Sequence, residues 1–159
     1  MRIFGYISKA LGAPKPGTLS YKASVAITDL NVPLFRLSRG RIGGSFDGVP
    51  VVLVHHVGRK SGEHRVTPLL HVTEGDNVVV IASMGGSPKH PAWFHNLKAG
   101  PDTEIELRGA VRRPVRARVA TGEERARLWE TAVAAYPTYA DYQARSRGRE
   151  IPVVVLEPR

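Results

Sequence analysis

Two glycine-flanked polar loops between residues 58 and 91 carry the side chains best suited to holding an anion. The first is Gly58-Arg59-Lys60-Ser61-Gly62, and the second runs from Ser83 through Gly85-Gly86 to Pro91. Glycines let backbone amides approach a ligand closely, basic side chains supply charge, and hydroxyls add neutral hydrogen bonds. A basic hairpin tip alone is usually a solvated turn, but the second loop and the nearby Arg65 favour a site for an elongated anion.

Other kinds of site find little support in the sequence. The first loop lies between two strand-like runs, so it is a hairpin and not the strand-to-helix entry of a nucleotide-binding fingerprint. The six histidines include no His/carboxylate set at metal-binding spacing, so no metal is expected. No serine occupies a nucleophile elbow, and the absence of cysteine excludes disulfides and thiolate chemistry.

Aromatic residues form two further groups. Trp93 and Leu97 stand at i and i+4 in a short helical pattern, where most such pairs belong to a core. Tyr136, Tyr139 and Tyr142 recur every three residues around Pro137, which makes them a cluster at a helix end. Such a cluster either caps the core or covers a flat ligand.

The elements that must position these residues are mostly short strands. Strand-like alternation is seen at residues 51–57, 65–72, 78–83, 103–108, 111–119 and 151–156. Hairpin turns are expected at residues 74–77 and 109–110, and Pro114 suggests an edge strand or a bulge. Helices are expected over residues 91–99, after a capping box at Thr121, and after Pro137 with Thr138 as the cap. The pattern predicts an α+β protein built on a small closed or partly closed barrel.

Composition limits the size and the partners of the protein. A chain of 159 residues with 42% hydrophobic residues is sufficient for one domain with its own core. The formal charge of +9 favours anionic partners. The arginines from Arg112 to Arg118 lack the interleaved aromatics that a nucleic-acid surface would need, so no nucleic-acid partner is expected. No apolar run approaches the roughly 20 residues needed to span a bilayer, and a cytoplasmic location is expected.

The N-terminal region is the most one-sided in charge, with seven basic residues and one acid over residues 1–41. Ile3, Phe4, Ile7 and Leu11 would share one side of a short helix. A basic arm over residues 1–42 and a barrel domain over residues 43–159 are therefore predicted. The arm either packs a few apolar residues on the domain or attaches peripherally to an anionic membrane at its inner face.

Several motifs between Gly43 and Pro158, in consistent order, resemble the deazaflavin-dependent nitroreductase family of actinobacteria. They are Gly58-Arg59-Lys60-Ser61-Gly62, Arg65-Val66-Thr67-Pro68-Leu69, Ala82-Ser83-Met84-Gly85-Gly86, Pro91-Ala92-Trp93-Phe94-His95-Asn96-Leu97, Tyr136-Pro137-Thr138-Tyr139-Ala140-Asp141-Tyr142 and the terminal Ile151–Pro158. The resemblance implies a split β-barrel, of the flavin reductase and pyridoxamine-phosphate oxidase type, that binds coenzyme F420. The reduced cofactor would deliver a hydride to quinones, nitroaromatics or other activated acceptors.

The resemblance also implies roles for individual residues. The cofactor's phosphate and acidic tail would contact Arg59, Lys60, Ser61 and Arg65. Its ring would lie against Val66, Thr67, Pro68, Leu69, Leu70, Ile81, Ala82, Ser83, Met84, Ala92, Trp93, Phe94, His95, Asn96 and Tyr139. The catalytic group facing the acceptor would be Ser83, Tyr136, Tyr139 and Tyr142. Leu70 and Met84 replace an aromatic residue and a lysine of the best-known members, so the resemblance does not by itself imply activation of nitro-prodrugs.

Two readings from other classes remain open at this level. One is an F420-binding carrier, or ligand-binding barrel, that catalyses nothing. The other is a basic adaptor at a membrane or nucleic-acid surface. The oligomeric state and the physiological acceptor are not encoded in any motif described above.

Overall fold

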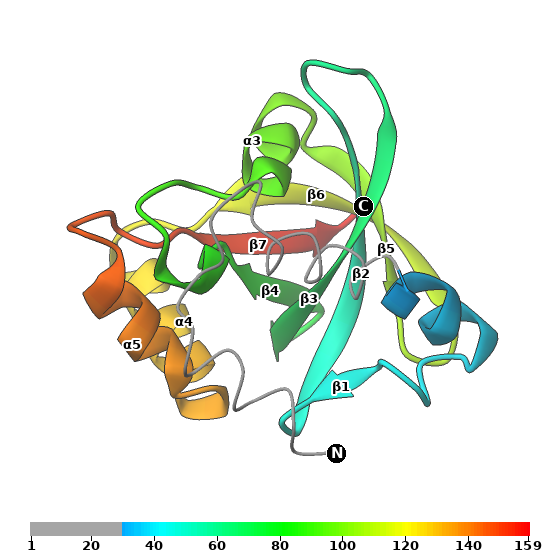
Figure 1. Cartoon of the computed structure of the whole chain (residues 1–159), viewed down its shortest axis with the longest axis horizontal. Helices are drawn as coiled ribbons and strands as arrows, with labels where there is room; N and C mark the ends of the chain where they lie inside the picture. Colours follow the sequence, from blue (N-terminus) through cyan, green and yellow to red (C-terminus); the bar gives the residue numbers. More distant parts are fainter. Residues whose placement is uncertain (1–29) are drawn as a thin grey trace.

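The computed structural model describes residues 30–159, so the expected helix at Ile3–Leu11 lies outside the described part of the chain. Seven strands account for most of the described fold (Figure 1). They are β1 (Ser45–Phe46), β2 (Val49–Val57), β3 (His64–Glu74), β4 (Asn77–Ile81), β5 (Asp102–Leu107), β6 (Val111–Val119) and β7 (Val153–Pro158). The six expected strands are confirmed, and β1 is an addition.

The strands pair antiparallel in the order β1-β2-β3-β4-β7-β6-β5. A further pairing of β5 with β2, in which Val54 lies opposite Ile105, closes strands β2 to β7 into a barrel. The expected hairpins are present between β3 and β4 and between β5 and β6, where Gly109 and Ala110 have positive φ. The fold is thus the predicted split β-barrel of the α+β class.

The barrel interior is filled by β-branched side chains, as the strand alternation requires. Val52, Val54, Val80 and Ile105 are almost completely buried there. Helix α3 (Ala92–Ala99) adds Trp93, Phe94 and Leu97 to the same cluster, so it packs over one opening of the barrel. In Figure 1, α3 lies above β6 and β7.

Two further helices pack against the outside of the barrel. Helices α4 (Gly122–Ala135) and α5 (Thr138–Arg145) cover the outer side of β4 and β7 (Figure 1). Leu128 and Ala132 of α4 are buried against Val79 and Val155 of these strands. The pair of helices places the three tyrosines, which lie where α4 ends and along α5, beside the end of β4.

Three local expectations were wrong. Thr121 occupies the N-cap of α4, but its side chain makes no capping hydrogen bond with the described residues. The other half of the box is also missing, because the Glu124 carboxylate binds Arg118 at 2.7 Å. The N-cap of α5 is Pro137, whose backbone is already helical, so Thr138 is the first helical residue. Strand β6 lies between β5 and β7, and Pro114 is accommodated because the ladder with β7 begins only at the following residue.

Candidate functional site

A cleft of about 700 Å³ lies between one wall of the barrel, a helical segment at residues 30–37 and the tyrosine cluster. This volume is within the usual range for a small-molecule site. Its lining residues are Leu30, Asn31, Leu34, Ile42, Gly43, Ser45, Phe46, Val51, Pro68, Leu69, Leu70, Ile81, Ser83, Met84, Gly85, Pro91, Trp93, Tyr136, Tyr139 and Tyr142. Most of these side chains are apolar or aromatic, so the cleft suits a flat organic ligand.

The tyrosine cluster forms one side of this cleft. Ring centroids of Tyr136 and Tyr139 are 5.1 Å apart and those of Tyr139 and Tyr142 are 6.3 Å apart, both in edge-to-face geometry. Burial, reinforced by the two neighbouring tyrosines, raises the pKa of Tyr139 well above its usual value. Tyr139 therefore keeps its proton at neutral pH and presents a hydrogen-bond donor beside an apolar cleft.

The second glycine loop forms the part of the cleft that follows β4. After Ser83 the chain makes one turn of 3-10 helix, η1 (Met84–Gly86), in which Met84 has a φ of 46°. A Cβ atom at Gly86 would lie 2.7 Å from the carbonyl oxygen of Tyr142, so only glycine allows the loop to approach α5 this closely. The loop and the tyrosine helix are therefore in direct backbone contact.

The helical residues 30–37 form the opposite wall through Leu30 and Leu34. Phe35, which is 1% exposed, holds this segment against Val51 and Leu53 of β2. In the sequence, the signal for this wall is the i, i+4 spacing of Leu30 and Leu34, and no role was predicted from it.

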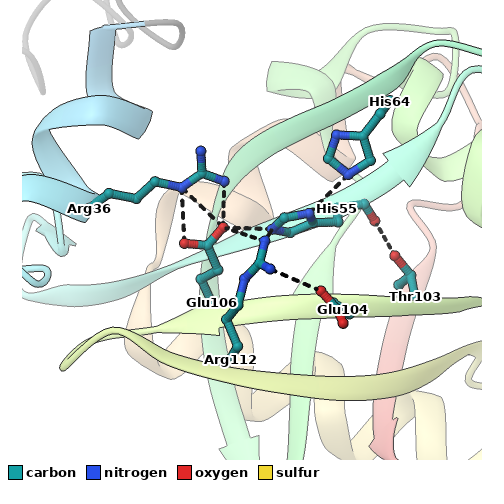
Figure 2. A network of polar contacts seen from close by, with 7 residues as sticks. All are labelled: Arg36, His55, His64, Thr103, Glu104, Glu106 and Arg112. Atoms are coloured by element: carbon teal, nitrogen blue, oxygen red, sulfur yellow. Dashed lines mark hydrogen bonds and ion pairs between the residues drawn. The ribbon is translucent and has the colours of Figure 1, made fainter.

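A buried carboxylate ties the same segment to the barrel (Figure 2). Glu106 of β5 accepts hydrogen bonds from Arg36, with 3.0 Å between Nε and Oε2, and its Oε1 lies 2.6 Å from Nε2 of His55. The hydrogen bonds from Arg36, with His55 adding to them, lower the pKa of Glu106 to about 2 despite its burial. Burial lowers the pKa of His55. The Arg36–Glu106 pair thus holds the cleft wall in place from behind.

The basic loop lies beyond the cleft, at the tip of the β2–β3 hairpin, where Arg59, Lys60 and Ser61 are exposed. Arg65 on β3 pairs with Glu63 at 2.6 Å, also in an exposed position. Since a strand rises about 3.3 Å per residue, Arg65 lies about 10 Å along β3 from Pro68 in the cleft. A ligand in the cleft with an extended acidic tail could therefore follow β3 to this tip.

A buried hydrogen-bond chain fastens the tip to α3. The backbone N–H of Arg59 donates to Asn96 Oδ1 at 3.0 Å, and Asn96 Nδ2 lies 3.0 Å from His56 Nδ1. His56 Nε2 lies 2.9 Å from the hydroxyl of Thr67. Burial, with the charges of Arg65 and the neighbouring histidines, lowers the pKa of His56 to about 4. His56 was given no role from the sequence, yet it connects two residues that were.

The expected site residues therefore separate into two groups. Those in the cleft lining are Pro68, Leu69, Leu70, Ile81, Ser83, Met84, Trp93, Tyr136, Tyr139 and Tyr142. Those outside the lining are Arg59, Lys60, Ser61, Arg65, Val66, Thr67, Ala82, Ala92, Phe94, His95 and Asn96. Ala82 and Phe94 belong to the barrel core, and the others lie on β3, on α3 or at the basic tip.

Solved structures resemble this fold closely. The structure of an F420-H2 dependent reductase, FDR-A, is 43% identical in sequence and superimposes with a TM-score of 0.62, covering 68% of this chain and 94% of its own. A second structure, described as a domain-swapped dimer, is 38% identical with a TM-score of 0.63 and covers 81% of this chain and 95% of its own. Fold and site together define an oxidoreductase of the split-barrel class.

Sequence comparisons are more specific. The family model for F420H(2)-dependent quinone reductases matches residues 28–158. An F420H(2)-dependent quinone reductase of Mycobacterium tuberculosis is 37% identical over 147 residues, which are 89% of this chain and 96% of the relative. A second protein of that organism, named for the same activity, is 47% identical over 120 residues, or 75% of this chain and 99% of the relative. The chain belongs to the F420H(2)-dependent quinone reductase family, which confirms the resemblance.

Membership of this family makes the protein an oxidoreductase whose hydride donor is reduced coenzyme F420. The residues present fit such a group. The cleft has apolar and aromatic walls for a ring, and Arg59 and Lys60 have no carboxylate partner among residues 30–159 that would compete with a ligand's acidic tail. In contrast, Arg116 and Arg118 of β6 are paired with carboxylates at 2.7 Å, so they present no open basic surface.

Proposed function

We propose that this protein transfers a hydride from reduced F420 to a quinone bound in the tyrosine-lined cleft. One observation carries the proposal most directly. In a chain of this family, an apolar cleft with Tyr139 and Ser83 in its lining includes residues 68–70 of β3, the strand that begins at the basic tip. At that tip Arg59 and Lys60 have no carboxylate partner within the described residues. The cleft suits the ring and the acceptor, and the tip suits the phosphate and acidic tail.

The residues of the tip would hold the tail of the cofactor. Arg59 and Lys60 are exposed and would bind phosphate or carboxylate oxygens through charge-assisted hydrogen bonds. Arg65 would exchange its exposed partner Glu63 for the ligand, at little cost, because exposed ion pairs contribute about 0 to 1 kcal/mol. Val66, Thr67 and Asn96 would support this contact from β3 and α3.

The residues of the cleft would orient the reactants. When bound, F420 supplies the hydride chemistry itself, so the protein's task is alignment and electrostatic stabilisation. The quinone gains two electrons and two protons, one proton arriving with the hydride and the other from a hydroxyl of the site or from water. Tyr139 and Ser83 would donate hydrogen bonds to the acceptor oxygen on which negative charge develops. The apolar walls would exclude water from the reacting atoms.

Cofactor titration and turnover test the proposal together. Oxidised F420 should bind more tightly than FMN, because only F420 has an acidic tail for the tip. Lys60→Ala should weaken F420 binding by roughly 1 to 3 kcal/mol, whereas the control Lys98→Ala, also exposed, should not. Equal or tighter FMN binding would contradict the cofactor assignment at the tip. If F420 binds but no quinone oxidises its reduced form, the protein is a carrier.

Other acceptors follow from the same cleft. Nitroaromatics are flat and electron-poor, as quinones are, and we propose that they compete for the same position. Initial rates with menadione and with a nitroarene, each measured alone and together, would test this. Additive rates at saturation would show separate sites and would contradict the proposal.

We also propose that the N-terminal arm attaches the protein peripherally to anionic membranes, on the basis of the spacing of Ile3, Phe4, Ile7 and Leu11. The docking of residues 30–37 means that the removable part of the predicted arm, residues 1–42, ends before residue 30. Deleting residues 1–16 should leave F420 affinity unchanged and reduce association with anionic vesicles. Unchanged vesicle binding would refute the membrane attachment.

A further inference from the structure

Arg149 lies behind the second glycine loop, outside the cleft lining, and the sequence reasoning assigned it no role. Its guanidinium donates to the carbonyl oxygens of Ser83 at 2.8 Å, Ala82 at 3.2 Å and Ser87 at 2.9 Å. Its Nη1 also lies 3.0 Å from Nδ1 of His90. One half-buried side chain therefore holds both ends of the loop that forms part of the cleft.

The backbone of Arg149 is itself held by the tyrosine helix. Its carbonyl oxygen accepts hydrogen bonds from Gln143 Nε2 at 2.8 Å and from the hydroxyl of Ser146 at 2.6 Å. Gln143 belongs to α5 and Ser146 is its C-cap, with no exposed surface. Helix α5 also carries Tyr139 and Tyr142. Arg149 is thus the link between the loop on one side of the cleft and the tyrosines on the other.

The link fixes the orientation of the loop as well as its position. All peptide bonds among the described residues are trans, so each N–H points opposite to the preceding C=O. Because Arg149 binds the carbonyl groups of Ala82 and Ser83, it sets both peptide planes that flank Ser83. A planar guanidinium with five donors can bind these acceptors at once, whereas a lysine ammonium is a point charge on a flexible stem.

We infer that Arg149 is a positioning residue for hydride transfer: it sets the separation between Ser83 on the loop and the tyrosines of α5, and so the alignment of the acceptor between them. The inference rests on the proposed function, because it assumes that the acceptor lies in this cleft. Arg149 would contact neither the acceptor nor the cofactor. Its effect on rate would come through the loop.

Arg149→Lys and Arg149→Met test the inference, with Arg147→Lys and Arg147→Met as controls in the same turn. Arg147 is exposed, and its side chain makes no hydrogen bond or ion pair within the described residues. Both Arg149 variants should lower kcat with menadione at least 10-fold while the Kd for oxidised F420 changes less than threefold. In the cofactor-free protein, amide hydrogen exchange of residues 83–90 should become faster. The Arg147 variants should match the wild type in all three measurements.

A purely structural role would reduce the amount of folded protein and leave kcat per F420-binding site unchanged. That result, or unchanged exchange of residues 83–90 in Arg149→Lys, would overturn the inference. If Arg149→Met does not fold, Ser146→Ala, which removes one of the bonds to the Arg149 carbonyl, should speed the same exchange and lower kcat. If the wild type reduces no quinone, the proposed function fails, and the exchange comparison still decides whether Arg149 holds the loop.

Discussion

At the scale of single residues, the hydroxyl groups beside the apolar cleft are the groups that we propose to act on the acceptor. Tyr139 is buried and protonated, and its ring contacts those of Tyr136 and Tyr142. Changing each tyrosine to phenylalanine keeps the ring packing and removes only the hydroxyl. For a hydroxyl that orients or protonates the acceptor, turnover should fall about 10- to 1000-fold, with F420 affinity within about 1 kcal/mol of the wild type. Stopped-flow oxidation of reduced F420 by menadione measures the loss of turnover. If the phenylalanine variants have a lower melting temperature and unchanged turnover, the tyrosine cluster has a structural role only.

Gly86 is the residue on which the close contact of the loop with α5 depends. Gly86→Ala should destabilise the protein for two reasons, because its φ is 79° and because the new Cβ would meet the Tyr142 carbonyl oxygen at 2.7 Å. Gly75→Ala is the matched control, since its φ is 58° and nothing lies within 4 Å of its Cβ position. The control should lose about 1 to 2 kcal/mol in urea unfolding, and Gly86→Ala should lose more. Equal losses would mean that the loop can move away from α5 without cost.

At the scale of elements, the helical residues 30–37 are attached to the barrel by the apolar side chains of Phe35 and Val32. The ion pair Arg36–Glu106 attaches the same segment to β5 (Figure 2). Glu106→Gln should lower the free energy of unfolding by about 1.5 to 3 kcal/mol, because a charged acceptor of several hydrogen bonds is lost. It should also raise the KM for the quinone more than the Kd for F420, since the wall carrying Leu30 and Leu34 loosens while the basic tip is untouched.

Glu104→Gln is the control for this prediction. Glu104 lies on the same strand and is exposed, and its nearest cation, Arg112, is 3.6 Å away. The control should be close to the wild type in both stability and KM. If Glu106→Gln and Glu104→Gln behave alike, the ion pair does not hold the cleft wall.

For the molecule as a whole, buried ionisable groups make stability depend on acid pH. The pKa of His56 is lowered to about 4 from an ordinary value of 6.5. Between these two pH values the unfolded chain therefore binds a proton at His56 and the folded chain does not. Stability should therefore fall by up to about 3 kcal/mol as the pH falls from about 6.5 to about 4. The lowered pKa of Glu106 adds a second loss as the pH falls below about 4.5 toward 2.

Urea unfolding at a series of pH values measures this dependence. His56→Gln should flatten the decline between about pH 6.5 and 4, and Glu106→Gln should flatten the decline below it. An unchanged slope in His56→Gln would show that His56 is not the group responsible.

Barrel closure also belongs to the scale of the whole molecule, because it brings together β2 and β5, which are far apart in sequence. The same closure places His55 beside Glu106 and creates the buried network that Arg36 completes. Among residues 30–159, no helix is both long enough and apolar enough to cross a bilayer.

The sequence by itself determined the strands and the family. The strand at Glu104–Leu107 and the turn at Gly109-Ala110 depend only on the two-residue period and on local backbone preference, so they could be predicted without knowledge of the rest of the chain. The same period would put Glu106 on a solvated face with Glu104, and that is wrong, because Arg36 from residues 30–37 covers and binds Glu106. The motifs that carried the resemblance were likewise contiguous, and the family, enzyme class and cofactor that they implied are confirmed.

Only the tertiary structure decided which distant residues share the site. The closing pair of β2 with β5, the wall at residues 30–37 and the position of Arg149 behind Ser83 all depend on packing between segments remote in sequence. The missing capping-box contact of Glu124 has the same origin. The local pattern predicts that Glu124 binds the start of its own helix, but its carboxylate binds Arg118 of β6 instead. Local patterns specify backbone conformation, whereas a site is assembled by whichever non-local contacts bury the most apolar surface and satisfy the most buried polar groups.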